Sequence, residues 1–240
     1  MSVVTDMSVN FTGAPCTFGD DQVAFANKYI RHVEHALRNA ENYISKLCPE
    51  ILSMEGMTGK KTRHFYNNLL TIDDARYLEI GTWKGSSVCS AMYGNSASVI
   101  CVDNWIFFDG PKDEFLNNFN RYMGGNNGIF LEEDCFKIDI SKIPKINIYM
   151  YDGDHKHEDQ YMALTYYYDC LDDIFIYVVD DWNHDPVRSG THAAIADLNL
   201  TILFGKEIRL TMDGHHTPQP QAADTWWNGM FVAVLKKNKK

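Results

Sequence analysis

Acidic residues follow two apolar segments in the second half of the chain. The segment INIYMY is followed by Asp152, and IFIYVV is followed by Asp180 and Asp181. Neighbouring strands of a parallel sheet lie about 5 Å apart, so these three carboxylates would converge and repel one another unless a cation neutralised them. Mg²⁺ prefers oxygen ligands and would lower the pKa of a bound hydroxyl. The pattern therefore predicts that Asp152, Asp180 and Asp181 bind Mg²⁺ or another hard divalent cation.

A histidine lies close to the first of these acids. His155 follows Asp152 in the sequence DGDH, and a histidine within reach of an acceptor hydroxyl can serve as its general base. We take His155 and Asp152 as the candidate catalytic residues. In the alternative interpretation, His155 caps the next helix or bonds to a strand carbonyl. His215 and His216 are expected in a loop that is exposed or adjacent to substrate.

The first apolar strand segment ends in a glycine-containing turn, EIGTWKGSS. Gly81 permits a tight turn, Gly85 lets backbone amides approach a ligand, and the start of the next helix offers free N–H donors to a carboxylate. Ser86 and Ser87 are candidate caps of that helix. An ordinary connection between a strand and a helix would explain the glycines equally well.

An acid also ends the next apolar segment, SVICVD. Asp103 lies 18 positions after Gly85, which is about the spacing at which a carboxylate on the next strand accepts hydrogen bonds from ribose hydroxyls. The chain has neither the G-x-G-x-x-G pattern of a dinucleotide site nor a Walker phosphate loop. These features favour a cofactor that contains ribose but no pyrophosphate.

The pattern E-x-G-x-x-x-G at 79–85 resembles the first motif of class I S-adenosylmethionine (SAM) methyltransferases, and VICVDNW resembles their second motif. The resemblance implies SAM as the cofactor, with its adenine at the side chain of Asp134 and the backbone of Cys135. Trp105, Phe107 and Phe108 could cover the adenine or pack in the core. The cofactor-binding residues that we predict are Glu79, Gly81, Thr82, Trp83, Gly85, Ser86, Ser87, Asp103, Asn104, Trp105, Asp134, Cys135 and Asp152.

Three later segments resemble a narrower group. YDGDH, VVDDW and GTHAAIADL are similar to segments of the metal-dependent small-molecule O-methyltransferases related to the macrocin and cephalosporin-biosynthesis enzymes. Over residues 77–198 the resemblance implies a Rossmann-like sheet, SAM, Mg²⁺ and methyl transfer to a hydroxyl oxygen. By position, Asp152, Asp180 and Asp181 would bind the metal and His155 would be the base. The segment WNHDPVRSG is longer than the corresponding turn of that group, so the resemblance does not extend to the acceptor.

Helical and strand patterns place these motifs in an α/β fold. Apolar residues recur every three or four positions from Asp21 to about Leu47, which predicts an amphipathic helix, and a second helix is expected over 58–70. Apolar segments then alternate with helical ones, as in a parallel sheet covered on both faces. Strands are expected at 75–80, 98–103, 128–134, 146–154 and 174–181, and helices near 86–93, 112–123, 157–171 and 190–203.

The chain closes with KEIRLTM and NGMFVAVLKK, two strands joined by the polar segment 213–227. We therefore predict a Rossmann-like, doubly wound, mostly parallel sheet with a terminal antiparallel strand pair and an N-terminal helical cap. Residues 1–72 would form the cap and residues 73–240 the methyltransferase domain, within one structural unit.

Charge and composition narrow the function classes. The 240 residues include 22 Lys plus Arg and 32 Asp plus Glu, which gives a net charge of −10. So acidic a protein repels phosphate backbones and anionic lipids, and we expect neither nucleic acid nor membrane as a partner. The six cysteines form no C-x-x-C pair, and the N-terminus has no basic leader, which favours a cytoplasmic protein.

Together these patterns predict SAM-dependent methyl transfer to a hydroxyl oxygen of a small-molecule acceptor, assisted by a divalent metal. The N-terminal helices are candidates for a homo-oligomer contact. A SAM methyltransferase without a metal is one alternative, and a non-catalytic nucleoside-binding or assembly subunit of the same fold is another. Charge and the lack of an N/D-P-P-Y/F segment disfavour a nucleic-acid methyltransferase.

Overall fold

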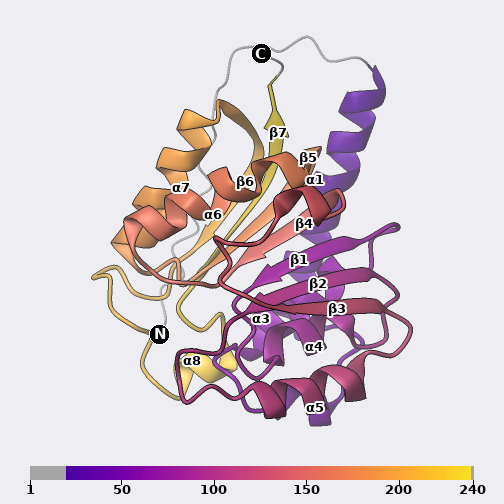
Figure 1. Ribbon diagram of the computed structural model, residues 1–240, viewed down its shortest axis with the longest axis vertical. Helices are drawn as coiled ribbons and strands as arrows, with labels where there is room; N and C mark the ends of the chain where they lie inside the picture. Colours follow the sequence, from indigo (N-terminus) through magenta and orange to yellow (C-terminus); the bar gives the residue numbers. More distant parts are fainter. Residues whose placement is uncertain (1–19, 239–240) are drawn as a thin grey trace.

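The structure, a computed structural model, describes residues 20–238 and has one seven-stranded sheet in the order β3-β2-β1-β4-β5-β7-β6 (Figure 1). Strands β1 to β5 are parallel, and β7 pairs antiparallel with both β5 and β6. The predicted Rossmann-like fold with a terminal antiparallel pair is confirmed. The strands are β1 (Arg76–Ile80), β2 (Ser98–Asp103), β3 (Asn127–Glu132), β4 (Ile146–Tyr151), β5 (Leu171–Asp180), β6 (Leu200–Ile208) and β7 (Met230–Lys237).

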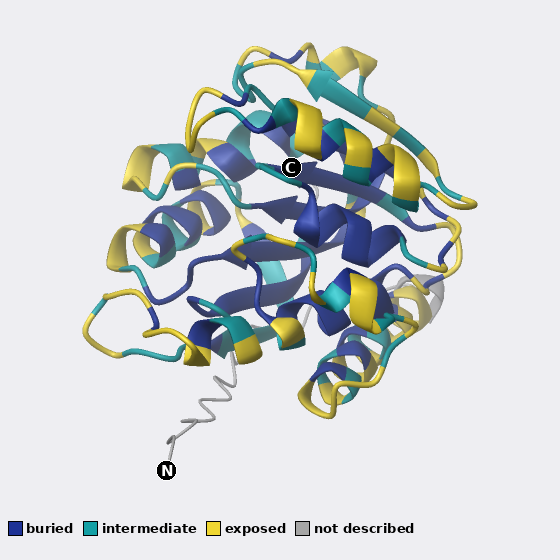
Figure 2. Ribbon diagram, turned by 90° about the horizontal axis from the view of Figure 1, so that it is seen from below, coloured by how far each residue is buried: buried dark blue, intermediate teal, exposed yellow. Residues whose placement is uncertain are grey.

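The central strands are apolar throughout because both of their faces are covered. Side chains of β4 and β5 alternate between two core clusters: Met150 and Val178 pack on one face, and Tyr149 and Tyr177 pack on the other. The rings of the two tyrosines stack with their centroids 5.2 Å apart. Figure 2 shows that the sheet is covered on both faces: the strands are buried (dark blue), and the outer faces of the helices are exposed (yellow).

Helices form a layer on each face of this sheet (Figure 1). One layer contains α1 (Asp20–Glu41), α3 (Lys60–Leu69), α4 (Ser86–Met92) and α5 (Lys112–Tyr122). The other layer contains α6 (His157–Tyr167) and α7 (Asp185–Asp197). The remaining helical segments are α2 (Pro49–Leu52), α8 (Gln221–Asp224) and the single turns Ile140–Lys142 and Tyr168–Cys170.

The N-terminal helices share a core with the sheet. One stripe of α1, which includes Val33 and Ala40, is buried in the cluster that α3 and the strands also form. The helix ends at Glu41 rather than near Leu47, because Tyr43 adopts a left-handed conformation (φ 55°) and the N–H of the next residue bonds back to Asn39. The division of the chain at residue 72 stays a prediction.

The segment after β5 departs from the predicted boundaries. Helix α7 begins at Asp185, with Pro186 in its first turn, where proline costs no helical hydrogen bond. Strand β6 then occupies part of the range 190–203 that we predicted as helix. A short apolar run is compatible with the periodicity of a helix or of a strand. Here the segment is a strand because it pairs with β7.

No helix within residues 20–238 combines the length and the apolar character that crossing a membrane requires. The expectation that the chain lacks a leader concerns residues 1–19, which lie outside the described range. The five cysteines inside that range are free thiols. The described core is therefore held by packing and hydrogen bonds, without a disulfide among these residues.

Candidate functional site

The ends of β1 and β4 meet at the carboxyl edge of the sheet. The N–H of Asp152 donates to the carbonyl of Ile80 at 2.9 Å. Gly81 turns the chain beside this contact with a φ of 83°, and a Cβ on it would lie 1.9 Å from the carbonyl oxygen of Asp152. Only glycine fits such a position. The predicted glycine turn and the first predicted metal ligand are therefore neighbours.

The rest of the turn joins β1 to α4. Gly85, with a φ of 86°, is the N-cap of this helix, and no side chain caps it. The prediction that Ser86 or Ser87 caps α4 is wrong because both residues lie inside the helix and their hydroxyls have other partners. Ser86 Oγ lies 3.0 Å from Thr58 Oγ1, and Ser87 Oγ donates to Glu79 at 2.6 Å.

Glu79 lies behind the turn. Its fully buried carboxylate accepts hydrogen bonds of 2.6 Å from Tyr77 Oη and from Ser87 Oγ. Burial raises the pKa of Glu79 to about 7 even though both donors act in the opposite direction. The side chain thus holds the turn against β1, and it would act on a bound cofactor only through that turn.

Asp103 fixes the backbone of the glycine turn from the end of β2. Its Oδ2 accepts the N–H groups of Thr82 and Trp83, each at 2.8 Å, and its Oδ1 accepts the N–H of Trp105 at 2.7 Å. A carboxylate has about four acceptor sites. Thr82 Oγ1 also lies 3.5 Å from Oδ2, whereas Trp105 N is the one described donor to Oδ1. This half-buried side chain therefore keeps an acceptor position for a hydroxyl on Oδ1.

The residues after Asp103 divide between core and surface. Trp105 is buried against Phe115, with ring centroids 5.0 Å apart, and its Nε1 donates to the carbonyl of Trp83 at 2.9 Å. Of the two interpretations of Trp105, core packing is the one that the structure shows. Asn104 is half-buried, and its Oδ1 accepts the N–H of Ile106 at 3.3 Å. The exposed apolar side chains that follow are Ile106, Phe107 and Phe108.

Asp134 and Cys135 follow β3 at the same edge of the sheet. Asp134 pairs with Lys137 Nζ at 3.0 Å and accepts the N–H of Phe136 at 3.0 Å, and these bonds lower its pKa. The carbonyl of half-buried Cys135 accepts Tyr167 Oη at 2.6 Å. The Asp134 carboxylate is thus engaged by its own loop, next to the strand that ends in Asp103.

The three predicted metal ligands follow adjacent strands. The pKa of Asp152 is raised, mainly by burial and to a smaller extent by the negative charge of Asp181. The pKa of Asp180 is also raised, mainly by burial and to a smaller extent by the charge of Asp152. The buried Oδ1 of Asp180 has no hydrogen-bond partner among the described residues. The mutual repulsion that the sequence pattern predicts is therefore present at the ends of β4 and β5.

His155 forms an ion pair with Asp181. Its Nε2 lies 2.7 Å from Asp181 Oδ2, and this hydrogen bond raises the pKa of His155 to about 9. Burial acts to raise the pKa of Asp181, but the bond from His155 outweighs it and lowers that pKa. At neutral pH the pair is an imidazolium and a carboxylate. His155 can therefore accept another proton only after it has released the one it holds.

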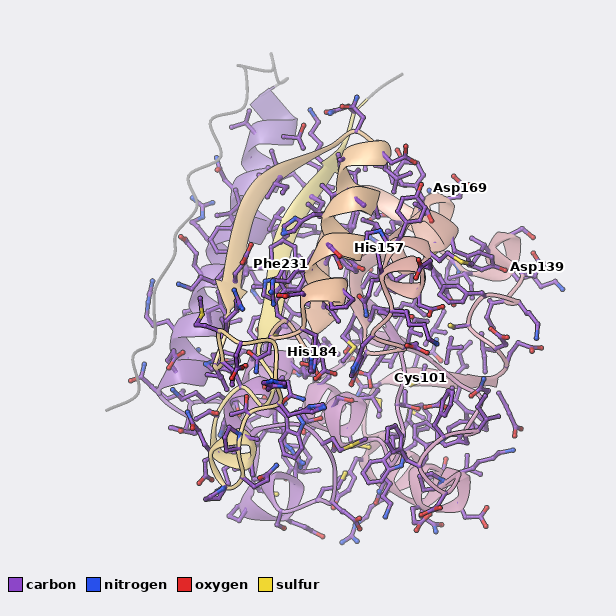
Figure 3. The ribbon with its side chains drawn as sticks, turned by 90° about the vertical axis from the view of Figure 1, so that its left-hand side faces the viewer. Cys101, Asp139, His157, Asp169, His184 and Phe231 are labelled. Atoms are coloured by element: carbon purple, nitrogen blue, oxygen red, sulfur yellow. The ribbon has the colours of Figure 1, made fainter. Side chains whose placement is uncertain are left out.

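Two residues that sequence reasoning did not assign as ligands, His184 and His216, complete the cluster. His184 precedes α7 and His216 lies in the loop between β6 and β7. The ring centroid of His184 lies 5.1 Å from that of His155 and 4.7 Å from that of His216. In Figure 3, His184 lies at the base of α7 beside this loop. In the sequence, the histidines of WNHD and DGHH were the only indication of these two ligands, and no known motif relates the spacing of the two segments.

The donor atoms form two overlapping groups that could hold a metal ion. Asp152, His155 and Asp181 make one group, and Asp181, His184 and His216 make the other, with the ligand atoms of each group within 4.8 Å of one another. Asp180 belongs to neither group. Imidazole nitrogens suit transition metals, whereas Mg²⁺ prefers oxygen. The donors thus fit a divalent cation, and the three-carboxylate Mg²⁺ site stays a prediction.

No protein-family model and no curated protein matches the chain. Solved structures match its fold. The O-methyltransferase from Bacillus cereus in complex with S-adenosylhomocysteine (SAH) has a TM-score of 0.51 and 14% identity, over 86% of this chain and 91% of that one. The SAH-bound methyltransferase PaMTH1 from Podospora anserina has a TM-score of 0.52 and 11% identity, over 95% and 100%.

TrmN from Thermus thermophilus also matches, with a TM-score of 0.53 and 12% identity over 79% of this chain. The chain spans about half of that protein, 52% of its length. Solved structures with this fold thus include an O-methyltransferase among other proteins, so the fold by itself does not fix the acceptor. The fold therefore does not support our expectation that nucleic acid is excluded as a partner. What the similarities show is the fold: the chain shares a Rossmann-like architecture with these solved methyltransferases.

Proposed function

We propose that this chain is a SAM-dependent methyltransferase that methylates a hydroxyl oxygen of a small-molecule acceptor with the help of a divalent cation. The observation that carries the proposal is the contact between two regions at one edge of a methyltransferase sheet. A glycine turn organised by Asp103 lies there against a cluster formed by Asp152, His155 and Asp181.

The glycine turn and Asp103 provide the cofactor half of the proposed site. Asp103 already holds the turn in shape, so a ribose hydroxyl would meet a preformed acceptor and little ordering would be needed on binding. The acids near Gly81 favour a cationic ligand, because the negative potential of Asp152 and its neighbours attracts positive charge. A sulfonium group carries such a charge. Asn104, Asp134 and Cys135 belong to this half as proposed adenine and ribose contacts.

Asp152 and Asp181 provide the acceptor half. A divalent cation bound there would lower the pKa of the acceptor hydroxyl and orient its oxygen. The two carboxylates would hold the cation, and the cation in turn would relieve the repulsion between Asp152 and Asp181. Asp180 lies next to Asp181 in the chain, and its place among the ligands stays a prediction.

His155 is the proposed general base. In the displacement, the acceptor oxygen bonds to the methyl carbon while the bond from that carbon to sulfur breaks, and the hydroxyl proton passes to a base. His155 can take that proton once it is neutral, and Asp181 then stabilises the imidazolium that forms. The residues therefore act mainly by orienting the oxygen and removing its proton.

Calorimetric titration with SAM tests the cofactor assignment. We expect one SAM per chain in the wild type and at least about tenfold weaker binding in Asp103→Ala, because the loss removes both the ribose acceptor and the anchor of the turn. The exposed Asp113 on α5 is a matched control, and Asp113→Ala should bind SAM normally. Absence of SAM binding in the wild type would contradict the proposal.

Chelator treatment separates the metal-assisted form of the proposal from its alternatives. With EDTA present, SAM binding should persist while methyl transfer to hydroxylated acceptors stops. Full turnover in EDTA would instead support the methyltransferase without a metal. SAM binding with no transfer to any acceptor, metal present, would support a non-catalytic nucleoside-binding subunit. Tight binding of RNA with a steep salt dependence would redirect the acceptor class to nucleic acid.

A further inference from the structure

We propose that Asp181, His184 and His216 form a second cation site, which binds a divalent transition-metal ion such as Zn²⁺. This site is distinct from the Asp152 side of the cluster. The inference goes beyond the proposed methyl transfer, because it stands on the geometry of these three side chains and does not require SAM.

The hydrogen bonds of His184 leave one nitrogen available as a ligand. His184 Nδ1 lies 2.9 Å from the carbonyl oxygen of Gly214. A carbonyl oxygen can only accept, so Nδ1 carries the proton and Nε2 of the neutral ring carries the lone pair. Nε2 is buried and has no hydrogen-bond partner among the described residues. A carbonyl bonded to the far nitrogen is the arrangement that orients metal-ligating histidines.

That unpartnered nitrogen lies near an anionic oxygen. His184 Nε2 is 3.9 Å from Asp181 Oδ1, too far for a hydrogen bond. Two ligands at the tetrahedral angle on one Zn²⁺ ion would be separated by about 3.4 Å, since each bond is about 2.1 Å long. The gap between these two atoms therefore matches an ion better than it matches a direct contact.

Asn228 supports the other two members of the site. Its buried Nδ2 donates to Asp181 Oδ1 at 2.6 Å and to His216 Nδ1 at 2.9 Å, and its Oδ1 accepts the N–H of Thr217 at 2.9 Å. His216 Nδ1 therefore carries the lone pair of the neutral ring, and it would bind an ion by exchanging the bond from Asn228 for the bond to the ion. One amide thus ties the loop between β6 and β7 to the end of β5. This brings His216 to Asp181 although 35 positions separate them.

The two carboxylate oxygens of Asp181 have different neighbours. Oδ2 pairs with His155 on the Asp152 side, while Oδ1 faces His184 and Asn228. A cation on the Oδ1 side would leave the ion pair with His155 in place. The second site can therefore be filled independently of the first.

The donor set selects the class of ion. Two imidazoles and one carboxylate suit Zn²⁺, Fe²⁺ or a similar ion and disfavour Mg²⁺. Three protein ligands leave at least one coordination position open, as in catalytic zinc sites. His216 is exposed, so this open position can face solvent or an acceptor.

The test is calorimetric titration of the chelator-treated full chain with Zn²⁺ and separately with Mg²⁺, together with Co²⁺ absorption spectra as a report on nitrogen ligands. We expect one tight Zn²⁺ per chain and at least about tenfold weaker Mg²⁺ binding at this site. His216→Ala should weaken Zn²⁺ binding by at least about tenfold and change the Co²⁺ spectrum. His184→Ala should do the same.

Two variants provide controls. His215→Ala alters an exposed histidine in the same loop, outside both groups, and should leave Zn²⁺ affinity unchanged. Asp152→Asn alters only the first group and should also leave it unchanged. Because His184 helps hold the loop, circular dichroism must show that His184→Ala folds, and exposed His216 provides the decisive variant if it does not.

The proposal is overturned if the wild type binds no Zn²⁺, if His216→Ala and His215→Ala behave alike, or if Asp152→Asn removes the ion. A failure of SAM to bind would leave this result untouched. The second metal site and the proposed methyl transfer can thus fail separately.

Discussion

At the ends of β1 and β2 the acidic side chains are held by hydrogen-bond donors of their own chain, whereas at the ends of β4 and β5 they face one another. Asp103 accepts three backbone N–H groups and Glu79 accepts two hydroxyls. By contrast, Asp180 Oδ1 has no hydrogen-bond partner within residues 20–238, and the pKa of Asp152 is raised by burial and by Asp181. We call these the turn region (79–87 with Asp103) and the cluster region (152–155 with 180–184).

The difference separates two uses of negative charge. In the turn region the carboxylates stabilise a loop, and the fold benefits directly from their bonds. In the cluster region the carboxylates are costly to the fold without a counter-charge, which is typical of sites whose function is to bind a cation. The acidic residues therefore serve structure on one side of Gly81 and, in the proposed function, ligand binding on the other.

The largest effect is expected where the two regions touch. Gly81→Ala would force a Cβ to within 1.9 Å of the Asp152 carbonyl at a left-handed φ, so it should lower the free energy of unfolding by about 3 kcal/mol or more. Urea unfolding measures this. Gly125 has no such contact, and Gly125→Ala should be tolerated. Equal stability of the two variants would mean that the regions do not touch as described.

The second prediction concerns cation binding by the cluster region. Asp181 belongs to both ligand groups, so Asp181→Asn should reduce affinity for divalent cations by about a hundredfold or more while SAM affinity changes little. Metal titration and SAM titration of the same variant measure the two quantities. Asp185→Asn, at the exposed start of α7, is the control. A parallel loss of both ligands would remove the distinction between the regions.

The turn region should lose stability when its acid is neutralised. Asp103→Asn replaces one acceptor oxygen with an amide that cannot accept the N–H groups of Thr82 and Trp83 while Trp105 keeps its partner. The free energy of unfolding should fall by about 2 kcal/mol. Chemical denaturation measures the change, and an unchanged midpoint would argue against Asp103 as the organiser of the turn.

In the cluster region, neutralising an acid should raise the free energy of unfolding instead of lowering it. Asp152→Asn removes a carboxyl group whose pKa is raised by burial and by Asp181. The metal-free chain should therefore become more stable by about 1 kcal/mol. The same denaturation experiment, run with chelator, measures this. A destabilised Asp152→Asn variant would contradict the account of repelling carboxylates.

The last prediction concerns pH dependence. The folded pKa of His155 is raised to about 9 by its bond to Asp181, above its unfolded value of about 6.5. The pair therefore stabilises the fold fully below pH 6.5, and this contribution disappears as the pH rises through about 9. The stability difference between wild type and His155→Gln should accordingly shrink between pH 6 and pH 10. A difference that is constant with pH would exclude the ion pair.

Much of the sheet could be predicted because its strands are short apolar runs bounded by acids and glycines. SVICVD coincides with β2, and the order of strand ends that carries Gly81, Asp103 and Asp152 follows from the parallel topology. The start of β6 could not be predicted, because an apolar run beside a helix suits either period until its pairing partner is known.

The site was predictable only where its residues directly follow strands. Asp152 and Asp181 follow β4 and β5, and the sheet brings them together. His216 comes from a loop, and its approach depends on the buried amide of Asn228, which no spacing rule describes. The hydroxyl partners of Glu79 and the backbone partners of Asp103 were likewise invisible in the sequence, because they are set by the turn's conformation.

The most direct test of the contrast between the two regions is anomalous diffraction from crystals of the full chain grown with SAH and Zn²⁺. We predict density for SAH against the glycine turn and Asp103, and an anomalous peak within about 2.3 Å of an Asp181 oxygen. SAH bound away from the turn region, or a structure in which the cluster region binds no ion at saturating metal, would contradict the account.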